Sequence, residues 1–124
     1  VIARPVMRDI GVAYQHTLFT RLREAGSDPI VLDSGFLLKA PVAVLKKLCD
    51  RCGIAFQQRM AHWPPGPKAY DGVWARHWYA NVHRTTGFEA PSGADVRPLP
   101  GHLDALYQEA RYFYEKLLPF SLKA

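Results

Sequence analysis

Pro29-Ile30-Val31-Leu32 is a short apolar run rich in β-branched residues, with Asp28 before it and Asp33-Ser34-Gly35 after it. A uniform apolar run of this length, placed between helical patterns, is typical of a parallel strand that is buried on both faces. Such a strand must pair with other parallel strands, each of which returns through a crossover connection. The rest of the sequence offers no partner strand. We therefore predict an α/β fold, mostly helical, in which this chain of 124 residues holds one strand of a larger sheet.

Helices are predicted on both sides of this run, because apolar residues recur there at helical spacing. Gly26 and Gly53 suit the ends of two of these helices, and Pro41 suits a first turn. A further turn or two of helix is expected between Ile54 and Trp63. The predicted helices cover residues 11–25, 41–52, 74–84 and 102–118.

Each amphipathic helix is expected to bury one apolar stripe and to leave its polar side chains on the opposite face. Gln15 and Arg21, for example, lie away from the stripe of the first helix. The apolar stripes are Tyr14, Leu18, Leu22 and Ala25 in the first helix, with Phe19 beside them, then Trp74, Trp78 and Val82 in the third, and Leu103, Leu106, Ala110, Phe113 and Leu117, predicted inward, in the last.

The composition is that of an ordinary globular protein, with 48% hydrophobic and 22% charged residues. The net charge of +5 favours anionic partners such as nucleotides, but the basic residues are scattered, which argues against nucleic acid. No apolar run approaches the roughly 20 residues of a membrane span, and no signal-peptide pattern opens the chain. We expect a cytoplasmic protein without a membrane partner, and the sequence leaves its oligomeric state open.

Cys49-Asp50-Arg51-Cys52 has the spacing of a metal-binding or redox motif. A zinc site would need further ligands, and the sequence contains no other cysteine and no suitable histidine pair. A redox thiolate would be opposed here by the dipole at the end of the predicted helix. We therefore predict two small core residues and no metal site.

The segment from Trp63 to Tyr79 has the most unusual composition in the chain, with three Trp and three Pro among its 17 residues. Lys68 and Arg76 supply positive charge for a phosphate or sulfate, and Gly72 lets a ligand approach the backbone closely. On the helix that follows, Arg76, His77, Asn81 and Arg84 lie on the polar side. Two alternatives stay open: an aromatic loop packed over the core with solvated cations, and a stacking surface for single-stranded nucleic acid.

Two blocks of the sequence resemble the bacterial sulfotransferase-like family, which includes proteins fused to aminotransferase-like domains. The first is PIVLDSGFLLKAPVAVLKKLCDRCGIAF, residues 29–56, and the second is WPPGPKAYDGVWARHWYANVHRTTGF, residues 63–88. The second block is similar to a late loop of sulfotransferases, R-K-G-x-x-G-x-W, that grips the 3′-phosphate of the donor. Aligned on Trp74, the chain keeps Lys68 and Gly72, whereas Pro67 and Ala69 stand where the motif has Arg and Gly.

The resemblance implies the C-terminal portion of a three-layer α/β/α sulfotransferase fold of the P-loop superfamily, with residues 1–124 forming one partial domain. It implies transfer of a sulfuryl group from 3′-phosphoadenosine 5′-phosphosulfate (PAPS) to a hydroxyl or amine of a small-molecule acceptor. The implied donor-binding residues are Lys68, Gly72, Trp74 and Arg76, and the implied acceptor-side residues are His77 and Asn81.

The phosphate loop and the catalytic base of the family precede the matched region, and no glycine-rich strand-to-helix turn occurs in this sequence. We therefore expect no catalytic residue in the chain and no transfer from PAPS by the chain alone. The alternative is a non-catalytic domain that binds a nucleotide or a protein partner.

Overall fold

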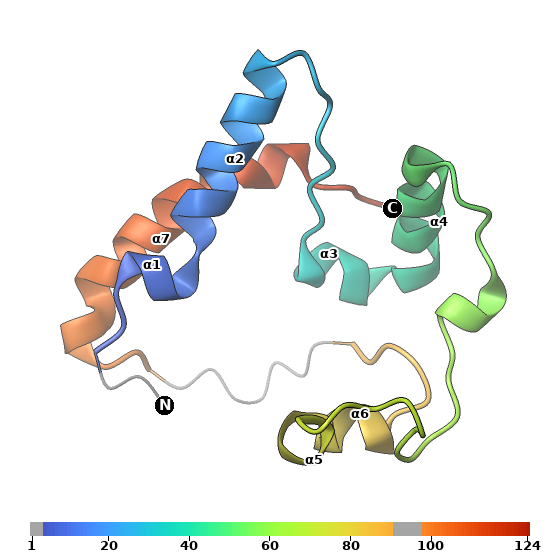
Figure 1. Ribbon diagram of the computed structural model, residues 1–124. Coiled ribbons are helices and arrows are strands. Elements are labelled where there is room, and N and C mark those ends of the chain that lie inside the picture. The colour runs from blue at the N-terminus through green and yellow to red at the C-terminus, as the bar shows by residue number, and fades with distance from the viewer. Residues whose placement is uncertain (1–3, 91–97) are drawn as a thin grey trace. The chain divides into compact units, whose positions relative to one another are not determined.

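The computed structural model describes residues 4–90 and 98–124, which fold into helices joined by loops (Figure 1). They divide into two compact units. The first unit comprises the described residues of 1–33 and 93–122, and the second comprises those of 34–92 and 123–124. The first unit contains α1 (Met7–Ile10), α2 (Val12–Glu24), α7 (Asp104–Leu117) and 3₁₀ segments at Gly101–Leu103 and Leu118–Phe120. The second unit contains α3 (Ser34–Lys39), α4 (Pro41–Cys52), α5 (Ala75–Trp78), α6 (Ala80–Arg84) and a 3₁₀ segment at Gln58–Met60.

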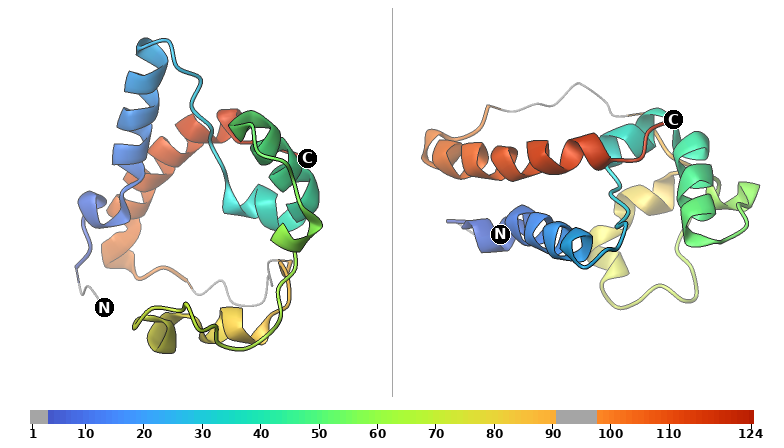
Figure 2. Two further views of the ribbon diagram at one scale, coloured as in Figure 1. Left: turned by 45° about the vertical axis from the view of Figure 1, so that its right-hand side comes forward. Right: turned by 90° about the horizontal axis from the view of Figure 1, so that it is seen from above.

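In the first unit, α1 and α2 pack along α7 (Figure 2). Gly11 joins α1 to α2 with a φ of 80°, a left-handed conformation that favours glycine. The predicted helix boundaries agree with α2 and α7 to within a few residues. The inward stripe predicted for α7 is confirmed, since Leu117 is buried and the other four residues of the stripe are half-buried.

The inward stripe predicted for α2 is wrong. Tyr14 and Leu18 are 65% and 59% exposed, and the face that packs on the C-terminal part of the chain holds His16 and Phe19 instead. The Phe19 ring lies 4.7 Å from the ring of Phe120, between centroids. Both faces of this helix carry apolar side chains. The contact between Phe19 and Phe120 decides which face is buried, and helical spacing alone does not predict that contact.

The predicted parallel strand at residues 29–32, and with it the α/β fold, is also wrong: no strand or sheet forms among residues 4–90 and 98–124. Val31 makes only an isolated parallel bridge to Ser121, and its carbonyl oxygen accepts a hydrogen bond of 3.0 Å from the N–H of Leu122. Ile30 and Val31 are half-buried and line a hollow together with Phe19 and Leu117. The apolar run is therefore only half-buried beside side chains of α2 and α7, and an apolar run alone does not distinguish this contact from burial in a sheet.

In the second unit, α4 has the boundaries that the sequence predicts. Pro41 lies in its first turn, and Gly53 ends it in the left-handed region with a φ of 66°. Val44 is fully buried. The prediction of two core cysteines is confirmed for Cys49, which is 6% exposed and lies with its Sγ 3.8 Å from the Sδ of Met60, and is wrong for the exposed Cys52.

The helix predicted over residues 74–84 is divided into α5 and α6 at Tyr79, whose backbone (φ −93°, ψ 8°) departs from helical geometry. The helical turn expected between Ile54 and Trp63 is the 3₁₀ segment Gln58–Met60. Within the two described ranges of the chain, no helix combines the length and the apolar character needed to cross a membrane.

Candidate functional site

The loop from Trp63 to Gly72 is tied to the end of α6 by backbone hydrogen bonds. The N–H of Gly66 donates to the carbonyl oxygen of His83 at 2.7 Å. The N–H of Trp63 donates to the carbonyl oxygen of Thr86 at 3.0 Å. Gly66 has a φ of 89°, so the turn at this point favours glycine. These bonds hold the proline-rich loop in one position against α6.

Lys68 is fixed at both its backbone and its ammonium group. Its backbone N–H donates to Oδ2 of Asp71 at 2.7 Å. Its Nζ donates to the carbonyl oxygens of Pro64 and Pro65 at 2.5 and 3.1 Å. An ammonium group has three N–H donors, so one donor remains after these two bonds. The positive charge of Lys68 is therefore held in a defined place and keeps the capacity to bind one ligand oxygen.

Asp71 and His83 form a shielded pair in the same segment. Oδ2 of Asp71 lies 2.8 Å from Nε2 of His83, and the two side chains are only 14% and 21% exposed. The hydrogen bond from the backbone N–H of Lys68 is the main cause that lowers the pKa of Asp71, with His83 adding to it and burial opposing it. Asp71 is therefore ionised at neutral pH. No spacing rule links residues 12 apart in a loop and a helix, so His83 could not be assigned to this site from the sequence.

These side chains surround a hollow of about 480 Å³, which we call the Lys68 hollow. It brings together three of the predicted donor-binding residues, Lys68, Gly72 and Arg76. A Cβ added at Gly72 would meet no atom within 4 Å, so the protein's own packing does not require glycine there and space is left for a ligand. The lining residues are Pro67, Lys68, Asp71, Gly72, Val73, Ala75, Arg76 and His83.

The inward stripe predicted for residues 74–82 is wrong. Trp74, Trp78 and Val82 are 61%, 72% and 52% exposed, and Ala75 is the buried residue of α5. The rings of Trp74 and Trp78 stack on each other with their centroids 5.5 Å apart. Because α5 is a single turn, it buries one small side chain and cannot bury a stripe three residues long.

The predicted acceptor-side residues do not line the Lys68 hollow. His77 and Asn81 are both exposed. Nε2 of His77 accepts a hydrogen bond of 3.1 Å from Nε of Arg76, and Oδ1 of Asn81 accepts one from Nη2 of Arg84. Trp74 is likewise absent from the lining of the hollow. Within residues 4–90 and 98–124, no group of three or more His, Cys, Asp or Glu side chains is placed to hold a metal ion.

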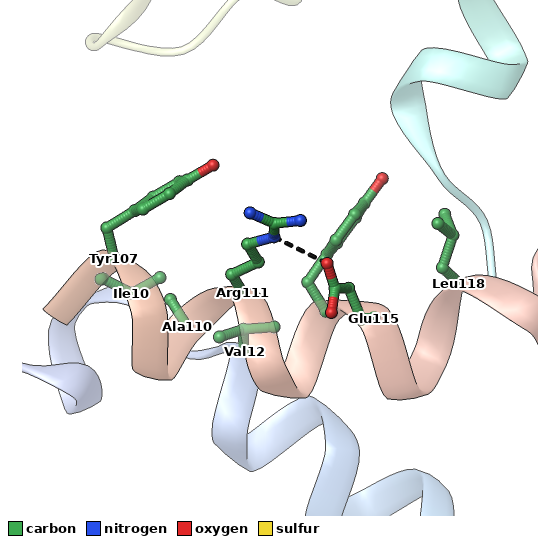
Figure 3. Close-up of a pocket in the computed structure, with 8 residues that line it drawn as sticks. Ile10, Val12, Tyr107, Ala110, Arg111, Glu115 and Leu118 are labelled. Carbon is green, nitrogen blue, oxygen red and sulfur yellow. Dashed lines mark hydrogen bonds and ion pairs between the residues drawn. The ribbon is translucent and has the colours of Figure 1, made fainter. Parts of the chain in front are cut away.

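A second hollow, of about 700 Å³, lies in the first unit (Figure 3). Its charged groups pair with each other, since Nε of Arg111 lies 2.6 Å from Oε1 of Glu115 and this carboxylate raises the pKa of Arg111. The Lys68 hollow instead holds two cations, Lys68 and Arg76, beside one carboxylate. An anion is therefore better matched by the Lys68 hollow. The hollow of the first unit is lined by Ile10, Val12, Tyr107, Ala110, Arg111, Tyr114, Glu115 and Leu118.

Comparison with known proteins shows the family of the chain. A family model described as a sulfotransferase domain matches residues 5–119. Two proteins of Arabidopsis thaliana, branched-chain-amino-acid aminotransferase-like proteins 1 and 2, are 38% identical over 87 residues and 36% identical over 83 residues. These matches cover 70% and 67% of this chain but only 16% and 15% of the two relatives. No solved structure matches the chain.

Proposed function

The chain belongs to the sulfotransferase domain family, and from this premise we propose that the Lys68 hollow holds the 3′-phosphate of the donor PAPS. In the whole protein, a small-molecule acceptor would take the sulfuryl group on a hydroxyl or an amine. The observation that carries this proposal is that Lys68, Gly72 and Arg76 line one hollow within the segment that resembles the phosphate-gripping loop of sulfotransferases.

The residues of the hollow fit a phosphate in charge and in shape. Lys68 retains one N–H donor, and the guanidinium of Arg76 offers its Nη donors, since its Nε is the atom that bonds His77. The missing side chain at Gly72 allows the ligand to approach the backbone. Asp71 opposes an anion, but its Oδ2 already accepts bonds from Lys68 and His83. When bound, PAPS supplies the sulfuryl group, and the role of these residues is to hold the nucleotide and balance its charge.

The outer contacts of the site are proposed on the same basis. An exposed indole offers its face to a base, and Trp74 is 61% exposed, so we assign it a contact with the nucleotide. We assign His77 and Asn81 to the acceptor side, because both are exposed and lie on the helical turns that follow Gly72. The cradle for the 5′-phosphosulfate is not part of this sequence, so we propose that the chain binds the nucleotide and does not transfer the sulfuryl group by itself.

Replacing Lys68 by Ala is expected to weaken the binding of adenosine 3′,5′-bisphosphate by about 10- to 100-fold, because a hydrogen bond to a charged group contributes about 1.5–3 kcal/mol. Isothermal titration calorimetry on the whole chain measures this change. The matched control is Lys47→Ala, which removes the same charge from an exposed position of α4 in the same unit and is expected to leave the affinity unchanged.

Lys68 also holds the carbonyl oxygens of Pro64 and Pro65, so a second variant separates ligand binding from loop structure. Arg76→Ala removes a side chain whose bond is to the exposed His77, and the loop is expected to stay intact while affinity falls by a similar factor. If Lys47→Ala lost as much affinity as Lys68→Ala, the assignment of the phosphate to the Lys68 hollow would be wrong. A chain that shows no saturable binding at all would favour a domain that recognises a protein partner instead.

A further inference from the structure

We propose that Cys49, Cys52 and Met60 form a three-sulfur site for a soft monovalent metal ion, Cu(I). Two findings lead to it: the thiol of Cys52 is exposed, and the sulfur atoms of Cys49 and Met60 are in contact. None of the three residues lines the Lys68 hollow, so the inference does not rest on the function proposed above.

The sulfur atoms of Cys49 and Met60 have the separation of two ligands of one metal ion. The Sγ of Cys49 lies 3.8 Å from the Sδ of Met60, to which its thiol donates a hydrogen bond. For metal–sulfur bonds of about 2.3 Å, this separation corresponds to a sulfur–metal–sulfur angle of about 110°, close to tetrahedral. An ion that replaces the thiol proton therefore bonds both atoms without a change in the distance between them.

Cys52 supplies the third ligand from the same helix. It lies three residues after Cys49 on α4, and side chains three residues apart are neighbours on a helix surface. Cys-x-x-Cys is also a spacing with which short metal motifs place two thiolates on one ion. Cys49 is buried, whereas Cys52 and Met60 are exposed, so an ion reaches the site from the solvent side.

The kind of ligand selects the metal. Thiolate and thioether sulfur are soft ligands that favour Cu(I), whereas Zn²⁺ in proteins is held by thiolates, imidazoles and carboxylates. Among residues 4–90 and 98–124, no three side chains of the types His, Cys, Asp and Glu gather around one point, which argues against zinc at Cys49 and Cys52. Spacing rules that count cysteine and histidine do not include Met60, so the sequence alone does not predict the site.

The position at the end of α4 favours a bound cation. The helix ends at Cys52 and Gly53, and its dipole places partial negative charge there. This charge opposes a bare thiolate but attracts a metal ion. On binding, two S–H bonds are replaced by two S–Cu bonds, the two protons pass to the solvent, and the neutral thioether of Met60 adds a third S–Cu bond. Copper stays Cu(I) throughout, so no oxidant or reductant is required.

The test is an anaerobic titration of the whole chain with Cu(I) held by the chromogenic chelator bicinchoninate, whose absorbance reports the ion that the protein removes. We expect one Cu(I) per chain, with three sulfur neighbours at about 2.3 Å in X-ray absorption spectra. Cys52→Ser is expected to lower the affinity by about 100-fold or more and Met60→Leu by about 10-fold or more, because even the loss of a residue that only orients a ligand lowers metal affinity by about 10- to 100-fold.

The matched control is Met7→Leu in α1, which removes the other methionine of the sequence and is expected to leave the affinity for Cu(I) unchanged. Circular dichroism of each variant shows whether the helices are retained. Cys52 is exposed, so Cys52→Ser is expected to fold, and the X-ray absorption spectrum of the wild-type chain requires no variant.

Two sulfur neighbours in the wild-type spectrum, or an affinity that Met60→Leu leaves unchanged, would mean a site of two cysteines alone and would overturn the inference. Binding that Cys52→Ser leaves unchanged, or that Met7→Leu weakens equally, would overturn it as well. The binding of adenosine 3′,5′-bisphosphate is expected to be the same in all three variants, so this inference and the proposed function fail separately.

Discussion

Val44→Asp is expected to unfold the second unit, with a loss of about 4 kcal/mol or more in the free energy of unfolding. Val44 has no exposed surface and lies in α4, so a carboxylate placed there would be buried without a partner. Denaturant titration followed by circular dichroism measures the change. The expected result is loss of the cooperative transition of this unit under conditions where the wild-type chain is folded.

Val82→Asp is the matched control for this variant, because Val82 lies in the same unit and is 52% exposed. A substitution on the surface usually changes stability by no more than about 0.5 kcal/mol. Equal losses in the two variants would mean that Val82 is buried as the sequence predicts, and that the arrangement of α5 and α6 described above is wrong.

Leu117→Ala is expected to lower the stability of the first unit by about 2–4 kcal/mol, the usual range for a Leu truncated in a core. Leu117 is 8% exposed and lines a hollow together with Phe19, Ile30 and Val31. The control is Leu18→Ala on α2, the same substitution at a residue that is 59% exposed, and a loss below about 1 kcal/mol is expected there. Thermal denaturation of both variants compares the two positions directly, and a larger loss at Leu18 would contradict the packing of α2 on α7.

The sequence predicted the helices well where a special residue marks a helix end. Pro41 and Gly53 bound α4 because proline fits a first turn and glycine tolerates the left-handed region. The apolar face of α7 was also predictable, since Leu106, Ala110 and Leu117 recur at helical spacing opposite charged residues. Local signals of this kind act within one or two helical turns, so they can be read without knowledge of the partner element.

The errors arise where burial depends on a distant partner. The run at residues 29–32 has the composition of a buried strand, but it is only half-buried beside α2 and α7, and its bridge is to Ser121 near the other end of the chain. On α2, the contact of Phe19 with Phe120 selects the buried face. The spacing of Trp74 and Trp78 indicated a helical stripe, whereas α5 is too short to bury one.

The candidate site divides in the same way. Lys68, Gly72 and Arg76 could be singled out from the sequence because charge and glycine within a short segment favour a phosphate, and the structure places all three on one hollow. His83 reaches that hollow only because backbone bonds hold the loop against α6. The roles of all six predicted site residues stay predictions, and Trp74, His77 and Asn81 also lie outside the lining of the hollow.

The most direct test of the account is an amide NMR titration of the whole chain with adenosine 3′,5′-bisphosphate and, separately, with adenosine 5′-monophosphate, which lacks the 3′-phosphate. We expect the bisphosphate to shift the amide signals of Lys68, Gly72 and Arg76 far more than the monophosphate does. Equal shifts with both nucleotides, or shifts confined to the residues around Tyr107 and Arg111 in the first unit, would contradict the assignment of the 3′-phosphate to the Lys68 hollow.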